Sequence, residues 1–285
     1  MTDPHTLSQQ PAPEGGGLLR FRLVLAYDGS DFAGWASQPD ARTVQTELGS
    51  AIERVMRATA RVTVAGRTDA GVHALGQVCH VDLPAGIWPG DEAAVRRLNA
   101  VLPADVRVLA AGAAPAGFDA RFSARSRAYE YLISDTGMLD PRSRSCVLVH
   151  HRRLDVPKMH MAGQVLLGEH DFAAFCKARP EASSVRTVLD LQVVRRADPR
   201  DPGLIAVDIT ADAFCHSMVR SVVGALVAVG EGRLDARRLS EVLAARRRVS
   251  LFATAPAHGL ALVAVEYPPD DQLAEQATRA RRYRG

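Results

Sequence analysis

The sequence contains no hydrophobic run that could cross a membrane. None of its apolar stretches approaches the roughly 18 consecutive residues that a membrane helix needs. Residues 1–17 are polar and rich in proline and glycine, so we expect a disordered tail there rather than a signal peptide. The composition, with 47% hydrophobic and 24% charged residues, is typical of a soluble globular protein. We therefore expect a cytoplasmic protein.

Cysteine is scarce, and its spacing shows no pattern. The chain has four cysteines: Cys79, Cys146, Cys176 and Cys215. No two of them form a Cys-x-x-Cys pair, the spacing that marks many zinc sites. His150 and His151 are adjacent, and neighbouring residues on a strand point to opposite faces, so they would make poor joint ligands. The sequence therefore predicts neither a disulfide framework nor a bound metal.

Lysine is almost absent. Of the 35 lysines and arginines only Lys158 and Lys177 are lysine, which leaves 33 arginines. Arginine suits phosphate contacts and base stacking, but the abundant alanine beside it indicates a biased coding composition as an equally good explanation. The net charge of +3 and the pI near 8.8 do not by themselves identify a protein that binds nucleic acid.

The stretch from Val64 to Leu83 predicts a strand, a polar turn and a second strand. Three glycines between the strands allow the backbone to turn sharply or to approach another group closely: Gly66, Gly71 and Gly76. Such a turn presents its side chains rather than burying them. The polar side chains that it presents are Arg67, Thr68, Asp69 and His73.

Asp69 is the candidate for chemistry in this turn. A carboxylate there can act as a base, a nucleophile or a metal ligand, or can simply cap its own turn, and spacing alone does not choose among these. The guanidinium of Arg67, two residues away, favours an ionised carboxylate and can orient it, or it can contact a phosphate instead. Taken alone, His73 and His80 favour structural roles because no partner triad is visible.

Hydrophobic periodicity predicts two successive units, each with the order strand, helix, strand, strand, helix, strand. In the first unit we expect strands at residues 19–27, 62–64, 77–81 and 106–110, and helices at 44–58 and 91–102. In the second we expect strands at 128–133, 186–194, 204–209 and 259–267, a helix at 155–166, and two consecutive helices before the last strand, at 218–229 and 235–247. Split βαβ units of this kind form mainly antiparallel sheets with helices on one face, which is an α+β fold.

The same pattern predicts the domain organisation. We expect an N-terminal α/β domain at 18–116 that carries the polar turn, and a C-terminal α/β domain at 117–268. Residues 269–285 are strongly charged, and we expect them to form a mobile tail.

Six segments resemble one family. Residues 66–78 read Gly-Arg-Thr-Asp-Ala-Gly-Val-His-Ala-Leu-Gly-Gln-Val, which resembles the active-site segment of the transfer-RNA pseudouridine synthase A family. Further matches are the Tyr-Asp-Gly segment that ends at Trp35, Arg-Ala-Tyr-Glu-Tyr at 127–131, Met-Val-Arg at 218–220 and the segment 254–260. Residues 118–124 also match, except that Asp119 stands where histidine is usual, and residues 249–253 depart from the family pattern.

The resemblance implies a fold and a reaction. It implies two ferredoxin-like, RNA-recognition-like halves, joined into one mainly antiparallel sheet with helices on one face and a central cleft. Asp69 would attack a uridine of the anticodon stem-loop, after which the glycosidic bond breaks, the uracil rotates and a carbon-carbon bond to ribose forms. The family needs no cofactor or metal and forms homodimers, so transfer RNA and a second copy are the implied partners.

The resemblance also implies roles for individual residues. Arg220 would reach Asp69 from the second domain, and Arg67 would accompany it as a catalytic residue. Tyr129 would line the uridine pocket together with Gly66, Thr68 and His73. From the strand pattern alone, Tyr129 and Tyr131 are better explained as half-buried sheet residues.

Three alternative functions follow from the same sequence. One is the same chemistry on another RNA or on further transfer-RNA positions. Another is an RNA-binding or folding-chaperone module that retains the scaffold without the activity. The last is an unrelated aspartate-based hydrolase, which the sequence disfavours because no second carboxylate, metal cluster or oxyanion motif accompanies Asp69.

Overall fold

The computed structural model describes residues 17–177, 183–196 and 203–284 of the chain, and the disordered tail expected at residues 1–17 lies almost wholly outside them. The chain folds as two compact units, one of residues 1–125 and 262–285, the other of residues 126–261. The sequence predicted two domains with the second at 117–268, whereas in the structure residues 117–125 and 262–268 belong to the first unit. Within the described ranges, no helix has the length and apolar character needed to span a membrane.

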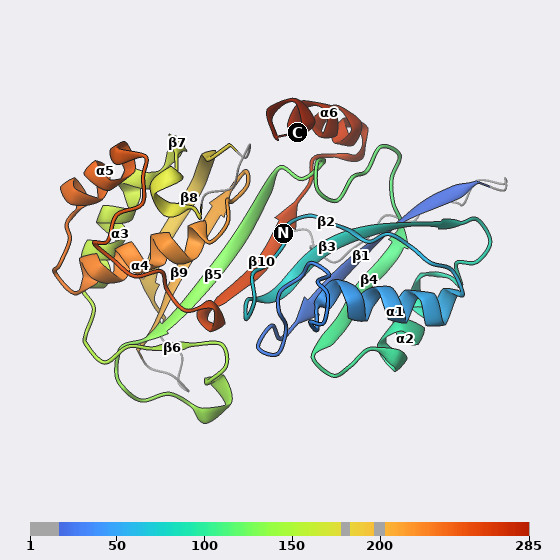
Figure 1. Ribbon diagram of the computed structural model, residues 1–285, viewed down its shortest axis with the longest axis horizontal. Coiled ribbons are helices and arrows are strands. Elements are labelled where there is room, and N and C mark those ends of the chain that lie inside the picture. Colours follow the sequence, from blue (N-terminus) through green and yellow to red (C-terminus); the bar gives the residue numbers. More distant parts are fainter. Residues whose placement is uncertain (1–16, 178–182, 197–202, 285) are drawn as a thin grey trace. The chain divides into compact units, whose positions relative to one another are not determined.

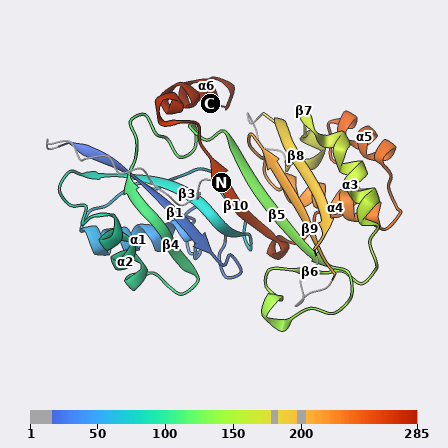
Figure 2. The same cartoon turned by 180° about the vertical axis from the view of Figure 1, so that it is seen from behind.

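The first unit is a sheet with two helices packed against it (Figures 1 and 2). Its strands are β1 (Leu18–Tyr27), β2 (Thr63–Val64), β3 (His73–Pro84), β4 (Val106–Ala113) and the end of β10 (Leu260–Glu266). They lie in the order β4-β1-β3-β10, with β2 paired to β3, and β1 is antiparallel to both β3 and β4. The helices are α1 (Val44–Met56) and α2 (Asp91–Val101), both close to the expected positions.

Capping and periodicity explain why α1 forms where it does. Thr43 is extended and its hydroxyl accepts a hydrogen bond from the backbone N–H of Thr46, which satisfies one of the free donors of the first turn. Val44, Leu48 and Ile52 then recur on one side of the helix and are almost completely buried. The helix ends where Arg57 adopts a left-handed backbone conformation.

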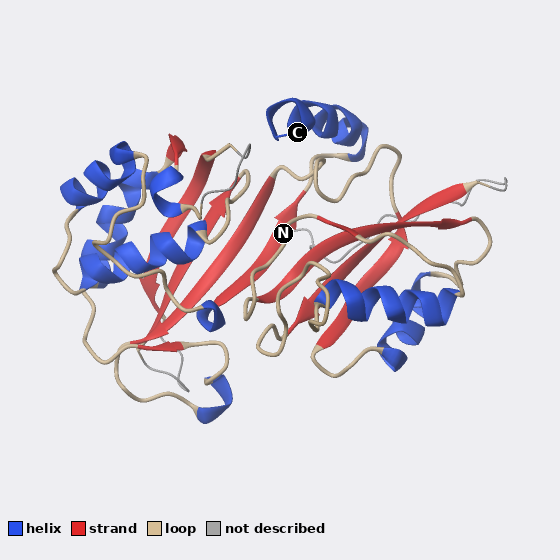
Figure 3. Cartoon of the chain, viewed as in Figure 1, coloured by secondary structure: helices blue, strands red, loops and turns tan. Residues whose placement is uncertain are grey.

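The second unit has the same kind of architecture, with helices on one face of an antiparallel sheet (Figure 3). Its strand order is β5-β9-β8-β7, and the short β6 pairs with β5. The strands are β5 (Ser126–Ser134), β6 (Leu148–Val149), β7 (Gly168–Asp171), β8 (Val185–Arg195) and β9 (Leu204–Ala211). The helices are α3 (Val156–Gly163), α4 (Met218–Gly230) and α5 (Ala236–Ala245). The predicted α+β class is thus confirmed.

The charged C-terminal segment is not the mobile tail that we expected. It forms a short 3₁₀ turn, η5 (Asp270–Gln272), followed by helix α6 (Leu273–Arg284). Leu273 is only 1% exposed and packs in a hydrophobic cluster with Val24, Val78 and Phe118. A second anchor is Asp119, which accepts a hydrogen bond from Arg281 at 2.9 Å. One buried leucine and one ion pair therefore fix a helix whose composition alone looks solvated.

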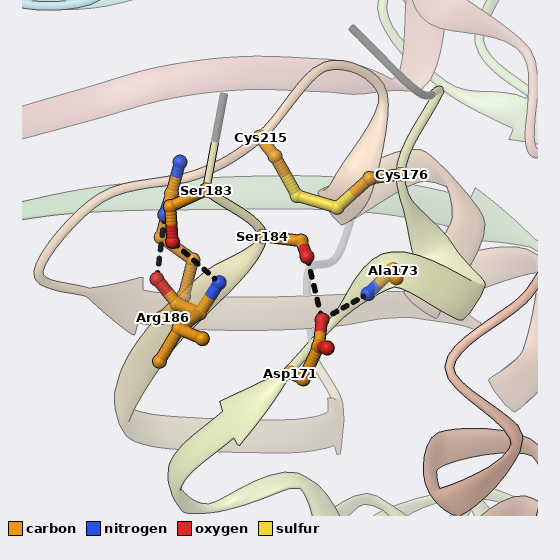
Figure 4. Close-up of a disulfide and its surroundings, with 8 residues drawn as sticks. Asp171, Ala173, Cys176, Ser183, Ser184, Arg186 and Cys215 are labelled. Carbon is orange, nitrogen blue, oxygen red and sulfur yellow. Dashed lines mark hydrogen bonds between the residues drawn. A yellow bond between two sulfur atoms is a disulfide. The ribbon is translucent and has the colours of Figure 1, made fainter. Parts of the chain in front are cut away.

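The second unit also contains a disulfide that the sequence did not predict. Cys176, at the end of the 3₁₀ turn η3 (Ala173–Phe175), is bonded to Cys215, and their Cα atoms lie 5.7 Å apart (Figure 4). A backbone hydrogen bond from the N–H of Lys177 to the carbonyl of His216 joins the same two segments. The pairing could not be foreseen because the two cysteines are 39 residues apart and only the folded sheet brings their segments together.

A buried carboxylate in the second unit makes its stability sensitive to acid. The side chain of Asp135 is completely buried and contacts Arg195 at 2.7 Å and Arg153 at 2.8 Å, and it also accepts the backbone N–H of Leu154. Burial opposes its ionisation, but the hydrogen bonds from Arg195 and Leu154 and the nearby positive charges prevail, so the pKa of Asp135 falls from 3.8 to about 2.

Because that pKa is depressed in the folded state, the stabilisation is fully present above pH 3.8 and is lost as the pH falls through about 2. We expect the ionised form to contribute about 2 kcal/mol to the free energy of unfolding. Urea unfolding of the wild type and of Asp135→Asn between pH 2 and pH 7 tests this. The difference in the free energy of unfolding between the two proteins should become smaller below pH 4. A difference that does not depend on pH would contradict the assignment.

Candidate active site

The polar turn that carries Asp69 joins β2 to β3 in the first unit, as the sequence predicted. The N–H of Ala65 donates to the carbonyl of Val78 at 2.8 Å, and the N–H of Val72 donates to the carbonyl of Asp69 at 3.2 Å. Gly71 has a φ of +76°, which an L side chain rarely adopts. The glycine is therefore required for the chain to enter β3 directly after Asp69.

A second segment supports the turn from the side. The N–H of Trp35 donates to the carbonyl of Thr68 at 3.1 Å, and the N–H of Gly71 donates to the carbonyl of Phe32 at 3.3 Å. Gly34 allows this approach, because a Cβ atom there would lie 2.8 Å from the carbonyl oxygen of Thr68, and its φ is +104°. Trp35 itself is fully buried. The aromatic segment thus holds the backbone of the turn.

Three buried side chains hold the turn from beneath. The hydroxyls of Tyr27 and Thr68 are hydrogen-bonded at 2.8 Å. The amide nitrogen of Gln77 donates to the Tyr27 hydroxyl at 3.3 Å and to the carbonyl of Gly66 at 2.8 Å. Burial raises the pKa of Tyr27 to about 12, against the opposing effect of its two hydrogen-bond partners, so the phenol stays neutral. Sequence reasoning did not single out Tyr27 or Gln77.

The side chains along the turn alternate in exposure. Arg67 is exposed, Thr68 is buried and Asp69 is half-buried. Thr68 and Gly66, which we expected to line a substrate pocket, make contacts that hold the turn itself. Arg67 and Asp69 are therefore more accessible than Thr68, and their roles toward a substrate and toward each other stay predictions.

The two histidines of β3 accept backbone hydrogen bonds. His73 accepts the N–H of Gly29 at 3.0 Å through Nδ1, and His80 accepts the N–H of Ala120 at 3.0 Å in the same way. Burial lowers the pKa of His80 to about 4, so its ring is neutral near pH 7. Both contacts agree with the structural roles that the sequence pattern favoured, and the role of His73 in substrate binding stays a prediction.

The second unit places the other candidate residues around the start of α4. Arg220 lies in the first turn of α4, where its Nε donates to the carbonyl of Ala255 at 2.8 Å. The N–H of Ala255 donates in turn to the carbonyl of Arg220 at 3.0 Å. These two bonds fix the start of the segment 254–260 against the helix. The arginine head group is thereby held in one orientation.

Tyr129 and Tyr131 point to the same face of β5. Tyr129 is 8% exposed and packs edge-on against Phe214, with ring centres 5.1 Å apart. Tyr131 is completely buried and donates to the carbonyl of Pro256 at 2.9 Å. Burial raises the pKa of Tyr131, with the charge of Arg220 acting in the opposite direction. Tyr131 is therefore a sheet residue, as the strand pattern indicated.

The structure gathers the expected site residues into two groups. Gly66, Arg67, Thr68, Asp69 and His73 lie together in the first unit, and Tyr129 and Arg220 lie together in the second. That Arg220 meets Asp69 stays a prediction. Asp119, which stands where histidine is usual in the family, makes contacts within the first unit. Its carboxylate accepts hydrogen bonds from the backbone N–H groups of Arg121 and Phe122.

Comparison with known proteins places this site in a family. A family model described as tRNA pseudouridine synthase matches residues 23–123 and 162–268, which include both groups of site residues except Tyr129. A protein of Frankia casuarinae named tRNA pseudouridine synthase A is 54% identical, covering 93% of this chain and 96% of the relative. A relative with the same name from Streptomyces griseus is 49% identical, covering 98% of this chain and 97% of the relative. Another from Mycobacterium leprae is 45% identical, covering 99% of this chain and 98% of the relative. The chain therefore belongs to the tRNA pseudouridine synthase family.

Proposed function

We propose that this protein converts uridine to pseudouridine in the anticodon stem-loop of transfer RNAs, with Asp69 as the nucleophile. The observation that supports this most directly is the turn itself. It presents a half-buried carboxylate on a backbone that is held by β1, by β3 and by the aromatic segment at residues 32–35. A nucleophile gains most from this arrangement because its attack depends on position.

The reaction conserves all the atoms of the uridine except for an exchanged proton. Asp69 attacks the nucleoside, the bond between ribose C1′ and uracil N1 breaks, and the uracil rotates. Carbon 5 of the uracil then bonds to C1′, and the bond that Asp69 formed with the nucleoside breaks, which frees the carboxylate. The hydrogen on carbon 5 leaves as a proton, and N1 gains a proton. These reaction steps need no oxidant, reductant or cofactor.

The remaining site residues serve this chemistry. Arg220 and Arg67 orient the carboxylate of Asp69, and Tyr129 stacks on the uracil once the base has left its helix. Gly66 and His73 shape the floor of the pocket, and Thr68 supports that floor from beneath. Recognition of the transfer RNA depends mainly on shape and phosphate contacts, to which the arginine-rich surface contributes.

The same proposal includes the setting of the reaction. The protein acts in the cytoplasm as a homodimer, in which one subunit holds the body of the RNA while the other presents its site. Light scattering at micromolar concentration should give the mass of two chains. The mass of a single chain would contradict the dimer without affecting the proposed reaction.

The test of the activity is release of tritium from transfer RNA labelled at uridine carbon 5, without added metal. We expect the wild type to release tritium and to leave pseudouridine in the anticodon stem-loop. Mapping pseudouridines in cells with and without the gene then identifies the positions. Pseudouridine lost from another RNA would show the same chemistry on a different substrate, and binding without tritium release would indicate an inactive RNA-binding module.

A further inference from the structure

We propose that Tyr27, Thr68 and Gln77 form a buried positioning network that sets where the carboxylate of Asp69 lies, and that this network controls turnover rather than RNA binding. The inference rests on the proposed function. None of the three side chains touches the substrate in this role. They act through the backbone of the turn and are therefore positioning residues.

The three side chains come from three separate elements that meet beneath the turn. Tyr27 ends β1, Thr68 lies in the turn and Gln77 lies in β3. Their exposed fractions are 5%, 6% and 0%, so water does not compete for their hydrogen bonds. A fully satisfied polar network in such surroundings fixes one geometry, because any broken contact leaves a buried group without a partner.

The contacts of Gln77 fix the direction of its hydrogen bonds. Its Oε1 accepts the N–H of Val78 at 3.1 Å, so the other end of the amide is Nε2, which donates both to Gly66 and to Tyr27. The hydroxyls of Tyr27 and Thr68 make the next hydrogen bond, in which either can be the donor. The network therefore runs without a break from Gln77 through Tyr27 to Thr68.

The network reaches the nucleophile through a single backbone link. Thr68 directly precedes Asp69, and it is held both by its hydroxyl and by its carbonyl, which accepts the N–H of Trp35. Gly34 packs so closely against that carbonyl that no Cβ atom fits there. With Thr68 held inward at two points, Asp69 is directed outward. A displacement of about 1 Å at a reacting group can cost about 100-fold in rate.

Two substitutions remove hydroxyls while they keep the shape of the core. Thr68→Val preserves the branched side chain, and Tyr27→Phe preserves the ring that lies 6.0 Å from that of Trp35. We expect Thr68→Val to lower kcat for tritium release by about 10- to 100-fold, with KM and Kd for transfer RNA within about threefold of the wild type. Thr68→Ser restores the hydroxyl and should recover most of kcat.

A matched control comes from another tyrosine of the same unit. The hydroxyl of Tyr267 donates a hydrogen bond to the carbonyl of Ala120 at 2.7 Å. Tyr267→Phe therefore removes one tyrosine hydroxyl and one hydrogen bond, as Tyr27→Phe does, but away from the turn. We expect it to leave kcat unchanged. The double variant Tyr27→Phe with Thr68→Val should lose little more kcat than Thr68→Val alone, because both changes break the same contact.

These measurements separate the possible outcomes. An active wild type with an unchanged kcat in Thr68→Val would overturn the network, as would a loss of kcat that Thr68→Ser does not recover or a loss matched by weaker transfer-RNA binding. A wild type that releases no tritium would instead refute the proposed function itself. Crystal structures of the wild type and of Thr68→Val provide a readout that needs no activity. We expect the Asp69 carboxylate to be displaced, and an unmoved carboxylate would overturn the proposal.

Discussion

Replacing Asp69 by asparagine is expected to lower tritium release from uridine carbon 5 by at least about 10⁴-fold. Asparagine keeps the size and most of the hydrogen-bonding capacity of the side chain, but its amide is not a nucleophile. Single-turnover release with excess enzyme measures the chemical step, and filter binding measures the affinity for transfer RNA. We expect the affinity to change by less than about threefold, because the phosphate contacts that dominate RNA affinity are untouched.

The control for this change is the same substitution at an exposed carboxylate of the first unit. Asp271 lies in η5 and is exposed, so Asp271→Asn should behave like the wild type in both assays. Release by Asp69→Asn at a few per cent of the wild-type rate would show that another group makes the attack. In that case Asp69 would only support the turn.

The second large effect is expected at Gly224 in α4. A Cβ atom there would lie 1.9 Å from the carbonyl oxygen of Ala253 and 3.0 Å from its carbonyl carbon. The obstacle is backbone, so Gly224→Ala must push α4 and the segment at 253–255 apart. We expect a loss of about 3 kcal/mol or more in the free energy of unfolding. The activity should fall as well, since the same displacement moves Arg220.

The chain offers a glycine of opposite behaviour as the comparison. Gly49 lies inside α1, and a Cβ atom there would meet nothing within 4 Å. Because glycine is a poor helix former, Gly49→Ala should raise the free energy of unfolding by up to about 1 kcal/mol. Urea unfolding of both variants gives the two values. If Gly224→Ala also raised the free energy of unfolding, helix propensity rather than the close contact with Ala253 would govern the effect at Gly224.

The sequence predicted the secondary structure well where the periodicity was strong. Helix α1 follows from Val44, Leu48 and Ile52 with a threonine cap, and α4 follows from its apolar residues between Met218 and Gly230. Helix α6 was missed because its composition is charged. Among residues 273–282, whose burial is described, only Leu273 and Ala277 are buried, and two apolar residues one turn apart in a charged segment do not make a pattern.

The candidate site was predictable to the extent that its residues are close in sequence. Arg67 and Asp69 lie within one recognisable segment, together with Thr68 and Gln77, whereas Tyr27, which completes the network beneath the turn, lies far from it in sequence. Thr68 is 41 residues from Tyr27, and Tyr27 is 50 residues from Gln77. Contacts of this kind depend on the register between β1 and β3, and the disulfide between Cys176 and Cys215 depends in the same way on the fold of the second unit.

The division of the chain has a consequence for its biosynthesis. The unit that begins the polypeptide also needs residues 262–285, which contribute the end of β10 and the buried Leu273 of α6. A ribosome synthesises residues 126–261 in full before it adds residues 262–285. Although domains usually fold from the N-terminus onward during synthesis, here the middle of the chain is complete first. The unit that carries Asp69 can close only after residues 262–285 have been added.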